Sequence, residues 1–145
     1  MGDAEAYFCP EDDCASVVIS QIGRAKSSIM FMYFSFTSGE IALQLLKMHK
    51  QGVRVEGIFE NTQLSQYSQF WMLRFQGVDV SEDCAGMLHH KVMVIDNKTV
   101  ITGSYNPTQN AQLRNDENLV VINDRDLALA YIKEYKKRKE CFRGS

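Results

Sequence analysis

The first half of the chain alternates short apolar runs with segments whose apolar residues recur at helical spacing. Strands are predicted over Glu5–Phe8 and Val53–Phe59. Between them, Ser28–Phe36 is a nearly continuous apolar run with aromatic and β-branched residues, which is typical of a strand buried on both faces of a sheet. A shorter extended segment is predicted at Val78–Val80.

Three helices are predicted among these strands. The first is capped by an aspartate at position 12 or 13 and continues through Ala25. The second is capped by Ser38 and ends at Gly52, and the third covers roughly Leu64–Phe75, ending near Gly77. The second helix shows the spacing most clearly, and its inward positions are Ile41, Ala42, Leu45, Leu46 and Met48.

The second half of the chain predicts a run of strands closed by one helix. His90–Ile95 and Thr99–Thr102 flank a tight turn at residues 96–98, so they form a hairpin. Asn118–Ile122 is the last strand, and a helix capped by Asp124 or Asp126 follows to about residue 139. This order predicts an α/β fold, a mixed and mostly central β-sheet with helices on both faces, in one domain covering residues 1–145.

Composition places the chain among globular domains. Of its 145 residues, 45% are hydrophobic and 23% are charged. No apolar run approaches the roughly 20 residues that a transmembrane helix needs, and the first residues lack the basic and apolar regions of a secretory signal. A soluble domain is therefore expected. Its location is left open, because an N-terminal segment that exports or anchors the protein could have been removed.

Charge is unevenly distributed along the chain. The formal net charge is −2, yet residues 133–145 carry six basic and two acidic side chains. This basic helical tail could touch a phosphate backbone. A solvated helix end is the favoured interpretation, since lysine and arginine stabilise the C-terminus of a helix.

The four cysteines leave two interpretations open. Cys9 and Cys14 are close enough in sequence for a short disulfide loop, and unpaired thiols are equally compatible with the pattern. A zinc site is not predicted, because neither CxxC nor HxxxH spacing supplies a ligand set.

Five polar residues form the candidate catalytic constellation. His89 and Lys91 are two apart and lie on the same face of a strand. Ser104 and Asn106 follow the partner strand, so the hairpin brings both pairs to one end of the sheet, and Glu117 begins the next strand. Each residue alone has a structural explanation as a surface or turn residue. Together, a base, a cation, a hydroxyl and an amide suit binding and attack of a phosphate.

The pattern HxKxxxxD, followed by GSxN, resembles the signature of the phospholipase D superfamily. Asp96 and Gly103 complete it, and both are interpreted as structural. The segment Tyr33–Thr37 is similar to another segment of the family, and the acidic residue at 117 matches the small nucleases. The resemblance extends along the whole chain and is strongest to the small, single-motif bacterial endonucleases, which implies a phospholipase D/nuclease-like fold.

The resemblance implies a two-step phosphodiesterase that needs no divalent metal and no other cofactor. His89 attacks phosphorus and forms a covalent phosphohistidine, and a second motif histidine protonates the leaving oxygen and then activates water. Glu117 accepts the proton on the far nitrogen of His89. Lys91, Ser104 and Asn106 bind the phosphate.

One chain carries only half of such a site. Besides His89, its histidines are His49, inside a predicted helix, and His90, which points to the other face of the strand and receives no catalytic role. The resemblance therefore implies a homodimer with a composite active site. The expected substrate is DNA, RNA or both.

Two other functions remain as alternatives. A lipid phosphodiesterase would use the same chemistry, but Phe70-Trp71-Met72 is the only candidate for membrane contact, and a core-facing helix explains it as well or better. A catalytically silent nucleic-acid-binding domain would retain the fold without turnover, which the presence of every expected site residue argues against.

Overall fold

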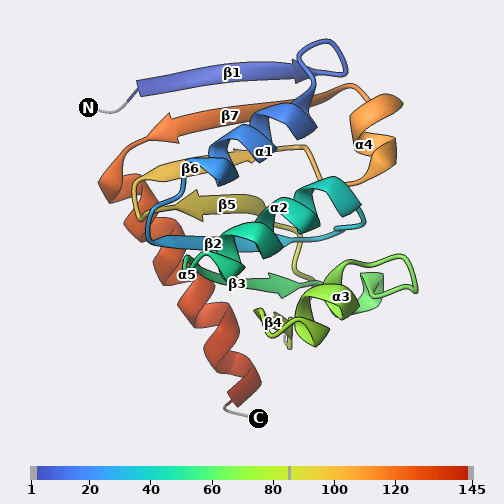
Figure 1. Cartoon of the computed structure of the whole chain (residues 1–145), viewed down its shortest axis with the longest axis vertical. Helices are drawn as coiled ribbons and strands as arrows, with labels where there is room; N and C mark the ends of the chain where they lie inside the picture. The colour runs from blue at the N-terminus through green and yellow to red at the C-terminus, as the bar shows by residue number, and fades with distance from the viewer. Residues whose placement is uncertain (1–2, 85, 144–145) are drawn as a thin grey trace.

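A mixed sheet of seven strands organises the residues that the computed structural model describes, 3–84 and 86–143 (Figure 1). The strands lie in the order β1-β7-β6-β5-β2-β3-β4. β3 is parallel to both of its neighbours, and the other adjacent pairs are antiparallel. The strands are β1 (Asp3–Cys9), β2 (Ser28–Tyr33), β3 (Arg54–Phe59), β4 (Asp79–Glu82), β5 (Lys91–Ile95), β6 (Thr99–Gly103) and β7 (Glu117–Asn123).

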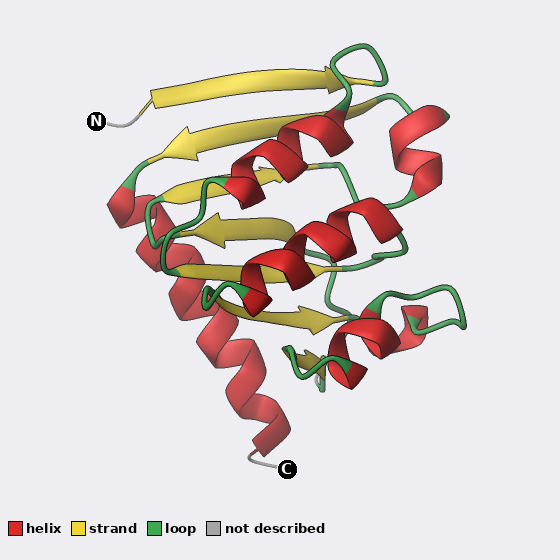
Figure 2. Cartoon of the chain, viewed as in Figure 1, coloured by secondary structure: helices red, strands yellow, loops and turns green. Residues whose placement is uncertain are grey.

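Helices cover both faces of this sheet, as predicted (Figure 2). Three lie on one face, and the long C-terminal helix crosses the other. A short helix before β7 lies beside one end of the sheet. The helices are α1 (Cys14–Gly23), α2 (Gly39–Lys50), α3 (Phe70–Phe75), α4 (Gln109–Leu113) and α5 (Arg125–Arg143), with a single 3₁₀ turn, η1 (Asn61–Gln63).

Strand β2 contributes to the core on both sides of the sheet. Phe31 and Tyr33 pack into the larger apolar cluster, beneath α1 and α2, whereas Met30 and Met32 pack into the smaller cluster beneath α5. Successive side chains of a strand point to opposite faces. The prediction of a strand buried on both faces is therefore confirmed, although the strand ends at Tyr33 and not at Phe36.

A glycine creates the space for the buried ring of Phe31. Gly57 pairs with Phe31 across the parallel strands β2 and β3. A Cβ atom at position 57 would overlap the phenyl ring of Phe31. The ring packs edge-on against Phe36 and Phe59, with centroid distances of 5.6 Å to each. An aromatic cluster thus joins β2 and β3.

The predicted helix over Leu64–Phe75 is wrong in its first half. Only Phe70–Phe75 is α-helical, and residues 64–69 form turns. The hydroxyl of Ser65 accepts a bond from the amide of Tyr67, and that of Ser68 accepts one from the amide of Phe70. Short hydroxyl side chains can bond backbone N–H groups in place of the helical hydrogen bonds. The spacing of apolar residues carries no information about this competition.

The hairpin prediction is confirmed. β5 and β6 pair antiparallel from Val92–Thr102 to Ile95–Thr99. The turn residues Asp96 and Asn97 both have positive φ, of 56° and 55°. This is the geometry of the two-residue turns that match the twist of a hairpin.

Of the two cysteine interpretations, the structure contains the disulfide. Cys9, the last residue of β1, is joined to Cys14, the first residue of α1, with their Cα atoms 5.8 Å apart. Within residues 3–84 and 86–143, no helix is both long and apolar enough to cross a membrane.

Candidate active site

The candidate catalytic residues gather at one end of the sheet. β2 and β6 end there, while β5 and β7 begin there, because β5 is antiparallel to both β2 and β6. The hydroxyl of Thr102 donates to the carbonyl of Lys91 at 2.9 Å, which holds the two motif strands in register. The predicted convergence of the two residue pairs follows from this topology.

His89, Lys91 and Phe34 form a compact group at this end. The Nζ atom of Lys91 lies 3.0 Å from Nδ1 of His89 and 2.9 Å from the His89 carbonyl oxygen. The ring of Phe34 lies 4.7 Å from the imidazole ring, and its centroid is 5.6 Å from Nζ. An ammonium group has no acceptor, so Nδ1 of His89 accepts this bond. His89 itself is exposed to solvent.

Lys91 is the cation of the site. Partial burial lowers the pKa of its ammonium group, and the negative charge of Glu117 acts in the opposite direction. A partly desolvated ammonium interacts more strongly with a nearby anion than one surrounded by water does. The structure therefore places a partly desolvated ammonium group beside His89.

Ser104 and Glu117 form a second polar group beside the first. The Ser104 hydroxyl donates a short hydrogen bond to Oε1 of Glu117 and accepts one from the amide of Asn118 at 3.0 Å. The other carboxylate oxygen of Glu117 accepts from Asn115 at 3.0 Å. From the sequence, Glu117 is expected to accept a hydrogen bond from His89, but its hydrogen bonds are to Ser104 and Asn115. Glu117 acts on the group around His89 through its electrostatic attraction to Lys91.

Gly103 is required by the backbone at this point. Its φ is 150°, and a Cβ atom there would overlap the carbonyl oxygen of Asn118. The strand consequently bends after Gly103, and Asn106 does not continue an extended strand. The side-chain oxygen of Asn106 instead accepts from the amide of Ser35 at 3.0 Å, which ties the segment after β6 to the end of β2.

Asp96 lies at the opposite end of the hairpin from this group. Its carboxylate accepts backbone bonds from Lys26, Ser27 and Ser28 at 2.8–3.1 Å. Burial alone would raise the pKa of Asp96, but these hydrogen bonds outweigh burial and hold it below its usual value. The expectation that Asp96 has a structural position fits these contacts.

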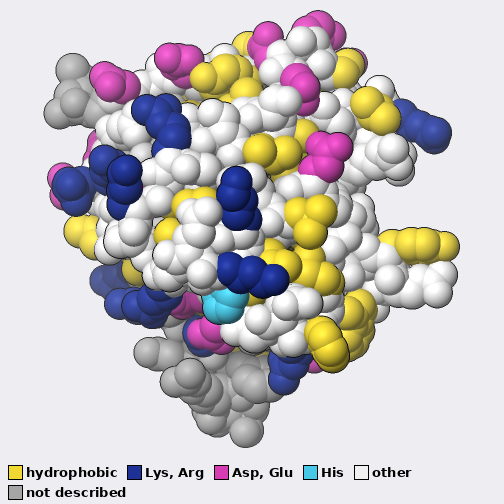
Figure 3. Space-filling view, in the orientation of Figure 1, with side chains coloured by type: hydrophobic (Ala, Val, Ile, Leu, Met, Phe, Trp, Pro, Cys, Tyr) yellow, Lys and Arg dark blue, Asp and Glu magenta, His cyan; other side chains and the backbone are white. Residues whose placement is uncertain are grey.

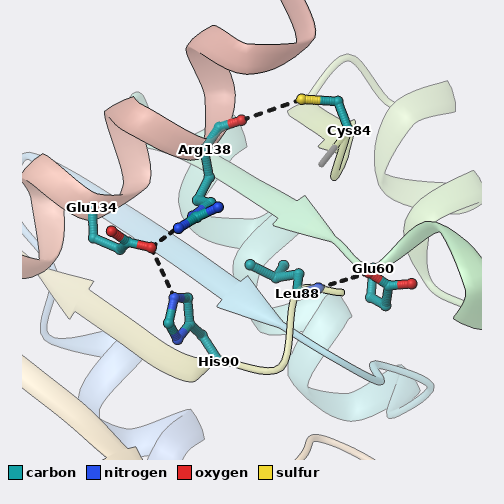
Figure 4. Close-up of polar contacts among 6 residues, drawn as sticks. All are labelled: Glu60, Cys84, Leu88, His90, Glu134 and Arg138. Atoms are coloured by element: carbon teal, nitrogen blue, oxygen red, sulfur yellow. Dashed lines mark hydrogen bonds and ion pairs between the residues drawn. The ribbon is translucent and has the colours of Figure 1, made fainter. Parts of the chain in front are cut away.

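A buried carboxylate holds the loop in front of His89 (Figure 4). Glu60 is 1% exposed and accepts from the amide of Leu88 at 2.8 Å and from the amide and hydroxyl of Thr62. Although burial alone would raise the pKa of Glu60, these hydrogen bonds lower it. The carboxylate is thus an ionised anchor one residue from His89. Glu60 was not identified from the sequence, because a single polar residue after a predicted strand does not stand out from other surface residues.

His90 faces away from the site, as predicted. Its Nε2 lies 2.9 Å from Glu134 of α5, and the same carboxylate oxygen accepts from Nε of Arg138 at 2.7 Å (Figure 4). Adjacent residues before β5 therefore serve opposite faces of the sheet. One of them belongs to the polar group around Lys91, and the other contacts the C-terminal helix.

A groove of about 1400 Å³ opens from this end of the sheet. Phe34, Asn106 and Glu117 line it where it meets the candidate site, and the turns around Tyr67 and helix α4 form its walls. Neither the groove nor α4 was predicted from the sequence. Among residues 3–84 and 86–143, no three histidine, cysteine or carboxylate side chains cluster as a metal site would require.

Most of the chain matches one known protein family. Residues 18–139 match the family described as cardiolipin synthase, PLD-like domain. The chain is 36% identical over 134 residues to phospholipase D of Rickettsia felis, covering 91% of this chain and 67% of that protein. It is 35% identical over 134 residues to the mitochondrial cardiolipin hydrolase of Xenopus tropicalis, covering 89% and 64%. It thus spans about two thirds of these relatives.

Two solved structures share the fold over nearly their whole length. Nuc from Salmonella typhimurium, described as a phospholipase D family member, superimposes with a TM-score of 0.91 at 32% identity, covering 97% of this chain and 95% of Nuc. NucT from Helicobacter pylori superimposes with a TM-score of 0.87 at 24% identity, covering 97% of both chains. The expected mixed sheet with helices on both faces is confirmed by this likeness.

Proposed function

Because the chain belongs to the phospholipase D superfamily, we propose that it is a metal-independent endonuclease that hydrolyses DNA or RNA through a covalent phosphohistidine. The observation that carries this proposal is the direct contact of Lys91 Nζ with His89 Nδ1, 3.0 Å away. A cation so placed can hold a phosphate oxygen while the neighbouring imidazole attacks phosphorus. The same contact also implies that substrate must rearrange the site before chemistry.

Substrate binding would release the lone pair of His89. In the free protein, Nδ1 of His89 accepts a bond from Lys91. A phosphate oxygen carries more negative charge than an imidazole nitrogen, so it draws the ammonium group toward itself. The imidazole then has an unprotonated nitrogen available, and Glu117, whose charge already acts on Lys91, is the carboxylate that accepts the ring's N–H.

The first chemical step forms a nitrogen–phosphorus bond. An imidazole nitrogen of His89 attacks phosphorus, the bond to the leaving oxygen breaks, and that oxygen takes a proton from an acid on the far side. In the second step, the same acid, now a base, removes a proton from water, whose oxygen displaces the imidazole from phosphorus. Asn106 supplies neutral donors to the phosphate oxygens, and the Ser104 hydroxyl does the same once it turns away from Glu117.

We propose that another copy of the chain supplies the second acid, because neither of the other histidines in these 145 residues is placed to do so. The other two histidines are His49, in α2, and His90, which is bound to Glu134 on the other face. A two-fold axis through the phosphate would place His89 of a second copy opposite the first and complete the site. We therefore propose a homodimer with one composite active site.

Nucleic acid is the proposed substrate because the chain matches Nuc over 95% of the length of Nuc. The relatives called phospholipase D and cardiolipin hydrolase make a lipid phosphodiesterase the second candidate. The triplet Phe70-Trp71-Met72 is the candidate for membrane contact in that case. Phe70 is 1% exposed and belongs to the core, whereas Trp71 is 51% exposed.

A substrate panel in EDTA tests the proposal. The protein is incubated with single-stranded and duplex oligonucleotides of DNA and RNA, and with phosphatidylcholine or cardiolipin vesicles. Cleavage of oligonucleotides with chelator present is expected, because Lys91 supplies the positive charge that a metal supplies elsewhere. Activity that disappears in EDTA and returns with magnesium contradicts the mechanism. Cleavage of lipid alone contradicts the substrate, and binding of nucleic acid without cleavage supports a silent domain.

A further inference from the structure

The groove beside the candidate site differs chemically from the site itself. Its described lining residues include no lysine or arginine, although they do include the carboxylates Asp13, Glu40 and Glu117. A phosphate backbone running along this groove would meet negative charge and no compensating cation. The phosphate-binding charge is concentrated instead at Lys91, where the groove begins. Whatever enters the groove beyond this point is therefore expected to be uncharged.

Amide side chains dominate the exposed walls of the groove. Four that are exposed to solvent lie on its two sides, two in the segment before α3 and two in α4: Gln63, Gln66, Gln109 and Asn110. An amide side chain carries both a donor and an acceptor without net charge. This is the combination that pairs with the edges of nucleobases, which present donors and acceptors side by side.

Two aromatic side chains are exposed on the same groove. Tyr67 is 70% exposed and Trp71 is 51% exposed, and both line it. Figure 3 shows hydrophobic side chains projecting from the surface in the region of η1 and α3. Large exposed aromatic rings next to a polar groove are typical of surfaces on which successive unpaired bases stack.

The Trp71 ring is held in place before any ligand arrives, and the backbone of Tyr67 is held beside it. The indole N–H of Trp71 donates to the carbonyl of Ser65 at 3.1 Å, and the amide of Tyr67 donates to the Ser65 hydroxyl at 3.2 Å. The Trp71 ring also packs edge-on against buried Phe70, with centroids 5.0 Å apart. The Trp71 ring, fixed in this way, loses little conformational freedom on binding, so its contact energy is retained as affinity. The bond of Tyr67 holds its backbone, which positions its exposed ring beside the groove.

We propose that this groove is a subsite for unpaired nucleobases of the substrate strand, with Tyr67 and Trp71 as stacking faces. This inference rests on the proposed nuclease function and deepens it. The scissile phosphate lies at His89 and Lys91, and the flanking bases turn into the groove, whose described lining has no lysine or arginine. Bases in a duplex are already stacked and paired, so they cannot offer these faces and edges without local opening. The subsite therefore selects single strands.

Trp71 allows a direct test, because it is the only tryptophan of the chain. A His89→Asn protein, which cannot turn over, is titrated with a short single-stranded oligonucleotide and with an abasic strand of equal length and charge. Saturable quenching of tryptophan fluorescence is expected with the first strand and not with the second. The abasic strand is also expected to bind about a hundredfold more weakly, the size of two lost stacking contacts.

Variants in the otherwise native protein complete the test. Tyr67→Ala and Trp71→Ala are each expected to weaken single-strand binding about tenfold and to reduce the preference for single strands over duplexes, while Trp71→Phe restores most of both. Phe75→Ala is the matched control, because Phe75 is 88% exposed one helical turn beyond Trp71 and does not line the groove. Phe75→Ala is expected to change neither the affinity for single strands nor the preference for single strands over duplexes.

The outcomes separate this inference from the function beneath it. Equal cleavage of ordinary and abasic strands, with unquenched Trp71, overturns the subsite while the nuclease function stands. Quenching by lipid vesicles and not by oligonucleotides overturns it in favour of membrane contact. Dissociation of the dimer in both alanine variants, with binding per dimer unchanged, overturns it in favour of a subunit interface. Failure to cleave any oligonucleotide contradicts the proposed function itself.

Discussion

At the scale of single residues, the site depends on which side of the strand each side chain faces. His89 contacts Lys91 two positions away, while His90 between them contacts Glu134 on the opposite face. The ring of Phe34 lies against both His89 and Lys91. An apolar ring at this position excludes water from one side of the ammonium group, which strengthens its attraction to a phosphate.

The proposed roles predict different kinetic effects for three substitutions. His89→Asn removes the nucleophile and should lower kcat by about 10⁴-fold or more, with the fold and phosphate binding retained. Lys91→Ala should reduce both affinity and kcat, because its charge acts on the bound substrate and on the transition state. Glu117→Gln should be milder than His89→Asn, since it alters ring orientation and support. Steady-state kinetics on one oligonucleotide distinguish the three.

Trapping of the covalent intermediate under acid-free conditions tests whether His89 is the nucleophile. Rapid quenching of the active protein with labelled substrate should place the phosphoryl group at position 89. A phosphohistidine at His49 or His90 in an active protein would refute the assignment.

At the scale of elements, the hairpin β5–β6 is attached at both ends to β2. Near the site, the amide of Phe34 donates to the carbonyl of His90 at 3.1 Å. At the turn, Asp96 accepts bonds from the backbone that leads into β2. The hairpin begins just after His89, the proposed nucleophile, and the contacts that hold its turn lie at the opposite end of the hairpin from His89.

Asp96→Ala should therefore lower stability without changing the chemistry. Three backbone N–H groups lose a charged acceptor, and the free energy of unfolding should fall by about 2 kcal/mol. The kcat of the folded fraction should be unchanged. Urea denaturation and kinetics on the same preparation measure the two quantities. A large loss of kcat at unaltered stability would mean that Asp96 takes part in catalysis.

The elements show where sequence reasoning succeeds. Helix α2 and the hairpin were predictable because apolar spacing, a serine cap and a tight turn agree locally. The start of α3 was not, because hydroxyl bonding at Ser65 and Ser68 overrides the apolar pattern. In the site, the motif residues were predictable from spacing. Phe34 and Glu60 were not, since their neighbours come from distant segments.

At the scale of the whole molecule, buried or hydrogen-bonded carboxylates make the stability of the folded protein depend on pH. Hydrogen bonds from Ser16 to Asp13, and the ion pair of Arg138 with Glu134, lower the pKa of both carboxyl groups. Glu60 and Asp96 are likewise held below their usual pKa. The unfolded chain therefore binds more protons than the folded protein in acid, and stability must fall as pH decreases.

Urea midpoints measured from pH 7 to pH 3 should reveal this loss. The midpoint should change little above pH 5 and fall as pH drops through about 4, where the unfolded carboxyl groups take up protons. Glu60→Gln should show a shallower fall, because one linked group is absent. A midpoint that is constant down to pH 3 would contradict the linkage.

The proposed composite site makes activity a property of pairs of chains. With about nine His89→Asn chains per native chain and free subunit exchange, activity per native chain should fall about tenfold, because most native chains have an inactive partner. Independent sites would leave activity per native chain unchanged. Titration of the mutant chain, followed by an oligonucleotide assay, distinguishes the two. Full activity in a protein that sediments as a monomer would exclude the shared site.

The contact between Gly57 and Phe31 has a consequence for how this sequence can change over time. The ring occupies the volume that any side chain at position 57 would need, so neither position can be altered alone without a clash or a cavity. Relatives with a larger residue at 57 should carry a smaller one at 31. Evolution at these two sites is then coupled, and a Gly57→Ala, Phe31→Leu double variant should fold better than Gly57→Ala alone.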